Sequence, residues 1–467
     1  MSLFSITNLI LLLCGCLSNA LNTGYKSYKG YAILTVQPGS QKDMEILRKL
    51  DSMFEEPMDY LKEPHGLRDK GQILVSPENL PLVKVFLNDH RIPFTTKPIH
   101  VGPARHRRAL RPTDPNQLSQ IVTSYLSYDD QMEYLDKTAA AFPYTTQIKN
   151  IGTSTEGRAI KIIKIGFPSP TGQPKPIIWV DAGIHAREWI SYSVALFFIQ
   201  QLTQNQKYSS IIKLIDFVIA PNVNPDGYEY SRTKDRFWRK TRSKHGDNRC
   251  YGSDGNRNYP FHFGEEGVTW NSCSEVYPGP YERSEPEVAA LVREIMAYRQ
   301  DIKAYVSLHS YGQEILYPWG HRTGVYPPDV NDLKAVAKKM ADAIQRFDGT
   351  VYNVLNSGDG LYPASGASDD WAKSAGVKYS FTIELSPDNL IDGYDRFVLS
   401  ESQINRVCNG VLPALDVLIK TVIHEFVHSP TIYMTKDPKP TTQYYIIRRS
   451  KRRRHYGRTG IFPGQRQ

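Results

Sequence analysis

The chain has 467 residues, of which 40% are hydrophobic and 22% charged, and its formal net charge is +9. This length allows more than one domain, and the composition is that of an ordinary globular protein, which excludes a disordered or fibrous chain. Residues 429–467 hold ten Lys and Arg and one Asp, so the excess charge belongs to a tail and indicates nothing about the partners of the rest.

The first 20 residues are typical of a secretory signal peptide. The apolar run within residues 9–20 is too short to span a bilayer, and Ser18-Asn19-Ala20 is a small-residue cleavage site. A buried N-terminal helix is the alternative. We expect no membrane-spanning segment further along the chain, and therefore a secreted, extracellular protein.

Residues from about 31 to 100 have the pattern of a small α+β domain. Strand-like and helical segments alternate along it, at residues 31–36, 42–53, 71–75, 80–87 and 93–99. A basic linker follows, in which Arg105-His106-Arg107-Arg108 precedes Ala109. Because R-x-R-R lies between two structured patterns, we expect cleavage after Arg108 by a proprotein convertase or a trypsin-like protease. An uncut, solvated basic linker is the alternative.

From Ser127 onward the chain alternates helical and strand-like segments, the pattern of an α/β fold. Four apolar runs are predicted strands, at residues 160–165, 177–182, 217–221 and 304–308. Polar groups at strand ends carry function in such folds, and His185 and Glu188 follow the second strand while His309 follows the fourth. Two histidines and a glutamate with an open fourth position form a catalytic zinc set, although H-x-x-E alone also describes a surface ion pair.

Three cysteines remain once Cys14 and Cys16 leave with the signal peptide. Cys250 and Cys273 bracket a loop-rich stretch and are the favoured disulfide pair. Cys408 is then expected to be a buried helical thiol.

A second metal motif, H-E-x-x-H, lies at residues 424–428 and on a helix could chelate zinc. The apolar residues of this helix form one stripe, at Leu415, Leu418, Val422 and Phe426. His424 and His428 then project to the opposite, solvent side. No glutamate follows to supply a third ligand, so we expect the motif to be accidental and reject an H-E-x-x-H endopeptidase.

Six motifs in a fixed order carry a resemblance to a known family. They are H-A-R-E-W from His185, W-R-K-T-R from Trp238, D-G-N-R-N from Asp254, L-H-S-Y from Leu308, Y-P-A-S-G from Tyr362 and F-T-I-E-L from Phe381. Over about residues 25–428 the chain resembles the pancreatic-type zinc carboxypeptidases, the A/B family of procarboxypeptidases. The resemblance implies a mixed, mostly parallel central sheet flanked by helices, preceded by a ferredoxin-like pro-domain.

The resemblance also implies the reaction chemistry. His185, Glu188 and His309 would bind one Zn²⁺ per chain, Glu384 would be the general base that activates water, and Arg239 would stabilise the oxyanion. Zinc brings the pKa of its water towards 7, where a carboxylate can take the proton, and a guanidinium in a dry cleft stabilises developing negative charge. Cys250 and Cys273 fall where this family has its disulfide.

The remaining family positions would contact the substrate, at Arg187, Asn256, Arg257, Tyr311, Tyr362 and Asp369. Asn256 and Arg257 would grip the terminal carboxylate, Tyr362 would close over it, and Arg187 would contact the peptide backbone. An arginine fork matches a terminal carboxylate, and no internal peptide bond supplies one, so such a site removes one terminal residue.

The side chain that is released is expected to be basic. Asp369 matches the position where B-type enzymes carry an acid and A-type enzymes an apolar residue, and a carboxylate there would pair with Lys or Arg. Ser357 and Gly320, at neighbouring pocket positions, are small. One alternative is that Asp369 is a solvent-facing loop acid, and another is A-type specificity for aromatic or aliphatic residues.

Residues 429–467 lie outside the resemblance. The run at residues 448–454 is basic enough to bind heparan sulfate, acidic matrix or an anionic membrane, while nucleic acid is not expected for a secreted chain. A solvated tail, or one removed by proteolysis, is the alternative. The prediction is thus a secreted zymogen with signal peptide 1–20, inhibitory pro-domain 21–108, catalytic domain 109–428 and tail 429–467, acting on peptide or protein C-termini. A catalytically silent heparin- or matrix-binding protein on the same fold is the alternative of a different class.

Overall fold

The computed structural model describes residues 24–51, 53–54, 58–64, 70–99, 101, 123–245, 250–388 and 396–427. The predicted signal peptide 1–20, the predicted cleavage point between Arg108 and Ala109, and the tail 429–467 lie outside the described residues.

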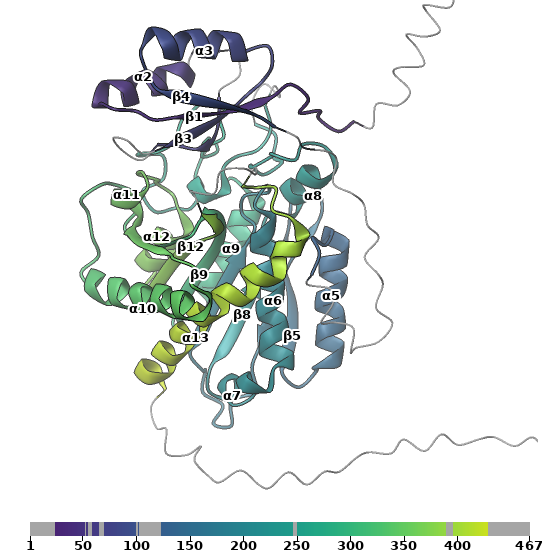
Figure 1. The fold of residues 1–467 in the computed structure, drawn as a ribbon. Helices are drawn as coiled ribbons and strands as arrows, with labels where there is room; N and C mark the ends of the chain where they lie inside the picture. Colours follow the sequence, from purple (N-terminus) through teal and green to yellow (C-terminus); the bar gives the residue numbers. More distant parts are fainter. Residues whose placement is uncertain are drawn as a thin grey trace, which may run out of the picture. The chain divides into compact units, whose positions relative to one another are not determined.

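The N-terminal region contains a four-stranded antiparallel sheet with two helices. The strands lie in the order β2 (Asp59–Lys62), β3 (Gly71–Val75), β1 (Ala32–Val36), β4 (Phe94–Pro98), and the helices are α2 (Gln41–Asp51) and α3 (Leu80–Asp89) (Figure 1). Side chains of a strand alternate between its two faces. Leu34 and Val36 pack with the helices in one cluster, whereas Ile33 and Leu74 face the other way. The predicted α+β pattern is confirmed, apart from β2, which was not predicted.

An eight-stranded mixed sheet forms the second part of the fold. Its order is β11 (Asn353–Asn356), β10 (Glu314–Tyr317), β12 (Tyr379–Asp388), β9 (Ile302–Gly312), β7 (Ile177–Ala182), β8 (Asp216–Ala220), β6 (Ala159–Ile165), β5 (Thr146–Thr153). The strands β8, β7, β9 and β12 run parallel in the middle. Antiparallel pairings of β6 with β5 and β8, and of β10 with β12, make the sheet mixed, as the resemblance implied.

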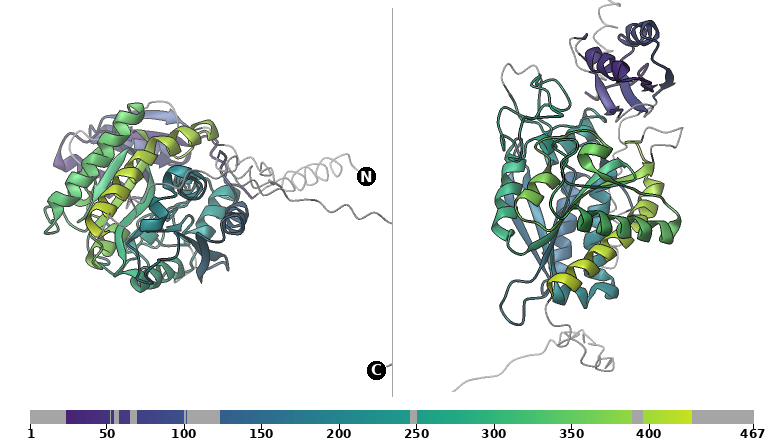
Figure 2. Two further views of the ribbon diagram at one scale, coloured as in Figure 1. Left: turned by 90° about the horizontal axis from the view of Figure 1, so that it is seen from below. Right: turned by 90° about the vertical axis from the view of Figure 1, so that its left-hand side faces the viewer.

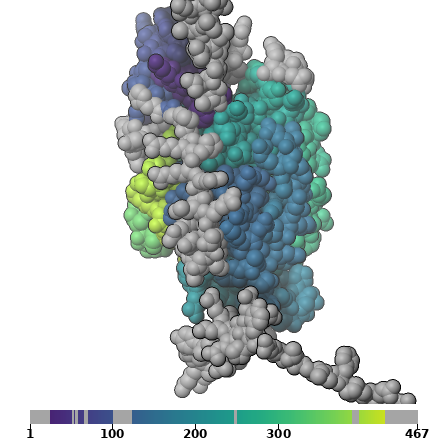
Figure 3. All heavy atoms as spheres, turned by 90° about the vertical axis from the view of Figure 1, so that its right-hand side faces the viewer, coloured from purple at the N-terminus to yellow at the C-terminus, as the bar shows by residue number. Residues whose placement is uncertain are grey.

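Helices cover both faces of this sheet (Figures 1 and 2). One apolar cluster joins one face to α5 (Tyr128–Ala141), α6 (Trp189–Gln204), α10 (Val330–Asp348) and α13 (Ile404–Phe426). A second cluster joins the other face to α9 (Pro286–Tyr298) and α12 (Ser368–Ser374). Figure 3 shows the side of the molecule on which blue residues, those of α5 among them, lie at the surface.

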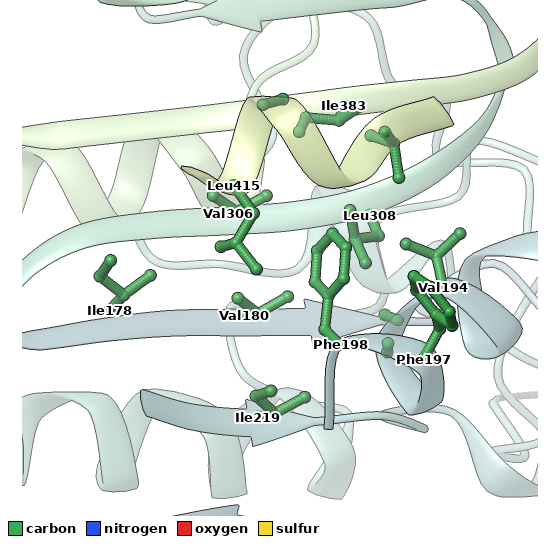
Figure 4. Close-up of a cluster of buried hydrophobic side chains, with 14 of the residues drawn as sticks. Ile178, Val180, Val194, Phe197, Phe198, Ile219, Val306, Leu308, Ile383 and Leu415 are labelled. Atoms are coloured by element: carbon green, nitrogen blue, oxygen red, sulfur yellow. The ribbon is translucent and has the colours of Figure 1, made fainter. Parts of the chain in front are cut away.

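The strand β7 is buried on both sides, and its alternating side chains divide between the two clusters. Ile178 and Val180 join the first cluster, while Ile177 and Trp179 join the second. In Figure 4, Val180 lies next to Phe198 of α6, between the strands and the helices that cover them. A strand buried on both faces needs a continuous apolar run, which explains why β7 was recognisable from the sequence.

The last helix, α13, closes the first cluster. The segment Glu401–Phe426 is long and apolar enough, by composition alone, to cross a membrane, which corrects the expectation that no later segment would be. In the structure Leu415 and Leu418 of this helix are buried against the sheet, so its apolar stripe belongs to the core. Cys408 is a free, buried thiol on the same helix, as predicted.

Candidate metal centre and active-site cleft

Two histidines and a glutamate meet at the ends of β7 and β9. His185 and Glu188 lie between β7 and α6, whereas His309 lies inside β9 and not after it, because this strand continues to Gly312. All three are buried, and one ligand atom from each lies within 4.8 Å of the others. His185 Nδ1 lies 2.7 Å from Glu188 Oε1, and His309 Nδ1 lies 3.2 Å from Glu188 Oε2.

The second nitrogen of each imidazole is held by an outer group. His185 Nε2 lies 3.0 Å from Asp254 Oδ1, and His309 Nε2 lies 3.2 Å from Ser307 Oγ. The two Nδ1 atoms face each other 3.2 Å apart, beside the Glu188 carboxylate. Two imidazoles and one carboxylate, each oriented by an outer hydrogen bond, suit Zn²⁺ and leave a coordination position for water or substrate.

Asp254 connects the metal site to Arg239. Arg239 Nη2 donates to Asp254 Oδ2 at 2.9 Å, and Arg239 Nη1 lies 3.8 Å from Glu188 Oε1. Asp254 is completely buried and also faces His185. A single carboxylate therefore orients both a metal ligand and the guanidinium beside it.

Glu384 is the acid–base candidate. It lies on β12 directly in register with His309 of β9, which places it at the metal end of the sheet. Burial, with the Glu188 carboxylate contributing, raises the pKa of Glu384 to about 8. A carboxyl group that titrates near neutrality can both take and return a proton.

The D-G-N-R-N segment forms a 3₁₀ turn, Gly255–Arg257, which presents Asn256 and Arg257 to the cleft. Asp254 caps this turn by accepting from Asn256 N at 2.9 Å. Arg257 donates from Nε to Gly267 O at 3.1 Å, so its guanidinium is tied to the neighbouring loop. The guanidinium carbon lies 5.8 Å from the ring centroid of Tyr362, which borders this end of the cleft.

The adjacent residues Asp369 and Asp370 have different surroundings. Asp370 accepts from Gly320 N at 2.7 Å and from His321 N at 2.8 Å, so it fixes a wall of the cleft. Asp369 lines the cleft, and its Oδ2 lies 3.3 Å from the donor Ser357 Oγ. Burial and the neighbouring Asp370 raise the pKa of Asp369 to about 7.

The N-terminal region contacts the cleft directly. Arg187 Nη1 donates to both oxygens of Asp59 in β2, at 2.8 and 3.1 Å, and Tyr311 donates from its hydroxyl to Gln72 Oε1 at 2.8 Å. Arg187 and Tyr311 were both predicted to contact substrate. In the full chain their polar groups are therefore already engaged by the pro-region.

Further contacts hold the two regions together. Lys26 Nζ lies 3.2 Å from Asp235 Oδ2, and Tyr28 donates from its hydroxyl to the same carboxylate. The second face of the N-terminal sheet packs on Phe237 and Phe397 in one apolar cluster.

One cavity of about 1090 Å³ unites the predicted site. All of the predicted metal-binding, catalytic and substrate-binding residues line it, namely His185, Arg187, Glu188, Arg239, Asn256, Arg257, His309, Tyr311, Tyr362, Asp369 and Glu384. Residues of the N-terminal region, including Tyr60 and Glu63, line the same cavity. The site is thus enclosed by both regions of the chain.

Two other sequence predictions can be compared with the structure. The predicted disulfide between Cys250 and Cys273 is present. His424 is exposed at the end of α13, while His428 lies outside the described residues. In the part of the chain that the structure describes, no group of three metal-ligating residues other than His185, Glu188 and His309 occurs, which agrees with an accidental H-E-x-x-H.

The sequence predictions missed two residues of this site. Asp254 opens the D-G-N-R-N motif, so its position was visible but its role was not assigned. Asp59 lies in a short polar segment, D-Y-L-K, that has no motif and little strand pattern. Only its contact with Arg187 reveals that it belongs to the cleft.

Two family models match this chain. One is described as zinc carboxypeptidase and matches residues 131–414, and the other is described as carboxypeptidase activation peptide and matches residues 34–97.

Similar curated proteins include both A-type and B-type enzymes. Carboxypeptidase B of Astacus astacus is 42% identical over 285 residues, covering 60% of this chain and 91% of its own. Carboxypeptidase B2 of Rattus norvegicus is 34% identical over 400 residues, which cover 84% of this chain and 93% of that protein. Carboxypeptidase A2 of Mus musculus is 33% identical over 387 residues, which cover 81% of this chain and 90% of that protein.

Solved structures are similar over most of this chain. The crystal structure of thrombin activatable fibrinolysis inhibitor matches with a TM-score of 0.74 and 31% identity, covering 85% of this chain and all of that one. The carboxypeptidase A from Helicoverpa armigera matches with a TM-score of 0.76 and 26% identity, covering 86% of this chain and 100% of that one.

Proposed function

This chain belongs to the zinc carboxypeptidase family and carries the family's activation peptide, and on that basis we propose a secreted zymogen whose active form removes C-terminal Lys or Arg. The observation that carries the basic specificity is Asp369, a buried carboxyl that lines the cleft beside Ser357. A cation at the end of a substrate side chain would pair with it, and a neutral side chain would leave it uncompensated.

His185, Glu188 and His309 would hold the metal in this mechanism. A bound Zn²⁺ would supply polarisation of a carbonyl group and a pKa of water near 7. Glu384 takes the proton of the attacking water and returns it to the leaving amine. Arg239, held by Asp254 at 2.9 Å, supplies positive charge where the carbonyl oxygen becomes negative.

Arg257 and Asn256 restrict the reaction to chain ends. A guanidinium fork binds a terminal carboxylate with two parallel hydrogen bonds, and an internal peptide bond has no such group. Tyr362, which borders the same end of the cleft, would cover the bound residue. The result is exopeptidase activity, with the released side chain directed to Asp369.

The pro-region supplies inhibition in this proposal. Asp59 occupies Arg187, and Gln72 occupies Tyr311, so a peptide cannot use either group before the pro-region leaves. Cleavage after Arg108, by a convertase or a trypsin-like protease, would start the mature enzyme at Ala109. An uncut chain with full activity on small substrates would contradict this part of the proposal.

The basic tail suggests a second, additional property. The run R-R-S-K-R-R-R at residues 448–454 provides the charge density that sulfated polysaccharides bind. We expect salt-sensitive retention on heparin that is lost on truncation before Ser429. Equal retention of the truncated chain would contradict it.

The function is tested by release of the terminal residue from matched peptides ending in Arg, Phe or Glu. The chain is first cleaved at Arg108 and assayed with and without a zinc chelator. Chelator-sensitive release of Arg alone is the expected result. Release of Phe instead would retain the carboxypeptidase and overturn the assignment of Asp369, and no release despite bound zinc would favour a binding protein on this fold.

A further inference from the structure

A second cavity, of about 550 Å³, lies outside the active-site cleft. Arg242, Lys244, Tyr251 and Tyr281 are among the residues that line it, and no described residue lines both this cavity and the cleft. Arg242 is the last residue of the W-R-K-T-R motif, and the function proposed above gives it no role. The cavity therefore holds a motif residue whose purpose is still open.

Three aromatic rings surround the guanidinium group of Arg242. Its central carbon lies 3.7 Å from the ring centroid of Tyr230, 4.5 Å from that of Trp238 and 4.7 Å from that of Tyr251. Ring faces attract a cation but offer no lone pair to the N–H donors, which lie in the plane of the guanidinium. The rings thus fix the position of the charge and leave its hydrogen-bonding capacity unused.

The side chain of Arg242 is only 10% exposed, and its Nε is buried with no hydrogen-bond partner in the part of the chain that the structure describes. The acid beside it is Glu156, whose Oε1 lies 3.5 Å from this Nε. The other oxygen of Glu156 accepts from Arg158 Nη1 at 2.8 Å, and its side chain is 41% exposed, so its pair with Arg242 is weak. A buried donor without an acceptor is costly, and an oxyanion in the cavity would supply that acceptor.

Lys244 adds a second positive charge to the cavity. This lysine is exposed, and its Nζ lies 5.7 Å from the centroid of the Tyr251 ring, the same ring that borders Arg242. Lys244 and Tyr251 are also joined by a backbone bridge, which keeps them together. Two cations therefore border one aromatic ring at the wall of the cavity.

Glu285, a fully buried acid, lies next to the same wall, where it accepts from the Ser243 hydroxyl. It also accepts from Ser253 Oγ at 2.9 Å, and its Oε1 lies 3.1 Å from His245 Nε2. Hydroxyl donors of the protein thus stabilise the charge of this acid. Neither Glu285 nor Glu156 takes up the donors of Arg242, which stay available to an anion from solution.

We propose that this cavity binds the sulfate ester of a sugar through Arg242 and Lys244. A carboxylate would occupy the guanidinium fork alone, whereas a tetrahedral oxyanion has a further oxygen for the ammonium group. Tyr251 and Tyr281 provide aromatic walls on which the apolar face of the sugar can pack, and Tyr281 is 63% exposed. This site lies on the catalytic body, so it depends neither on peptide cleavage nor on the basic run at residues 448–454.

The test uses the full chain and N-acetylglucosamine 6-sulfate, with binding measured by calorimetry at constant ionic strength. Arg242→Lys keeps a cation among the rings but removes the fork, and Lys244→Gln changes an exposed side chain. Arg406→Gln, at an exposed arginine on α13, is the matched control for the loss of one positive charge. Inorganic sulfate and unsulfated N-acetylglucosamine are titrated into the same proteins, and thermal midpoints check that each variant is folded.

The wild type and Arg406→Gln should bind the sulfated sugar equally. Relative to them, Arg242→Lys should bind about tenfold and Lys244→Gln about threefold more weakly, and the unsulfated sugar should not compete. Equal affinity of the wild type and folded Arg242→Lys would overturn the site. Equal affinity of the wild type for inorganic sulfate and for the sulfated sugar would overturn the role of the aromatic walls and restrict the site to the ion. No peptide is cleaved in this assay, so its outcome is independent of the proposed carboxypeptidase function.

Discussion

Asp369 and Asp370 are chemically identical neighbours that serve different purposes at the residue scale. The oxygens of Asp370 are used by the backbone N–H groups of Gly320 and His321, which gives that carboxylate a structural role. Asp369 lines the cleft beside a single serine hydroxyl, and its burial disfavours the charged form. A cation from the substrate would reverse that preference, which is the physical basis of the proposed selectivity.

Replacement of this acid tests the selectivity. For Asp369→Asn, of nearly equal size, we expect kcat/KM for an Arg-terminal peptide to fall by about 10²- to 10⁴-fold, because the substrate cation loses its partner. The kcat/KM for a Phe-terminal peptide should fall far less. Zinc content and the thermal midpoint serve as controls, and an equal loss for both peptides would contradict the role of Asp369.

Glu287 on α9 is a single carboxyl group that makes the stability of the fold depend on pH. Burial raises its pKa from the ordinary 4.5 to about 8, and among the described residues Oε2 has no hydrogen-bond partner. The folded state therefore holds this proton more strongly than the unfolded state. Its contribution to stability is fully present below about pH 4.5 and is lost as the pH rises through about 8.

Glu287→Gln should remove this pH dependence, because an amide does not ionise. Between about pH 5 and 8 the unfolding free energy of the wild type should fall by at least about 1 kcal/mol more than that of the variant. Urea midpoints at the two pH values provide the measurement. Glu282→Gln, at a glutamate whose side chain is 40% exposed, is the control and should follow the wild type.

At the scale of elements, the short strand β2 brings the pro-region to the cleft. Its Leu61 is buried in the apolar cluster that includes Phe237, while Asp59 reaches Arg187. The strand thus combines apolar contact with one ion pair whose arginine is almost completely buried. Loss of Asp59 removes the direct partner of that buried charge, which is more costly than the loss of a surface pair.

The ion pair can be tested by Asp59→Asn. After cleavage, we expect the variant pro-region to inhibit the enzyme at least about tenfold less tightly, because the buried Arg187 loses its ion-pair partner. Asp89→Asn, an exposed change at the end of α3, should inhibit as the wild type does. Equal inhibition constants for Asp59→Asn and the wild type would show that the ion pair does not contribute to inhibition.

At the scale of the whole molecule, the metal site connects the centre of the sheet to its covering loops. His309 lies within β9, and His185 and Glu188 lie where β7 passes into α6. A ligand that binds only the folded state shifts the folding equilibrium in proportion to its affinity.

Removal of zinc should therefore lower thermal stability as well as activity. We expect a chelator to reduce the Tm by several degrees, and added Zn²⁺ to restore it. His309→Gln, which lacks one ligand, should have a Tm that no longer responds to the chelator at the same concentration. A wild-type Tm unchanged by chelation would contradict a metal site that contributes to stability.

The predictable elements were those with strong local patterns. The strand at 71–75 was predicted with the bounds observed, and β7 was recognisable from its continuous apolar run. The end of β9 was misplaced because His309-Ser310-Tyr311 is polar, although it continues the strand beside β12. Pairing with a neighbouring strand, which no local pattern encodes, extended it.

Sequence by itself determined the family, the donor set for zinc, the candidate base and the disulfide, because each depends on specific residue types in short ordered motifs. Tertiary structure alone decided which groups meet across long separations. Asp59 contacts Arg187, and Asp254 orients both His185 and Arg239. Such contacts depend on how sheets, loops and the pro-region pack against one another, and that packing is a property of the whole chain rather than of any one segment.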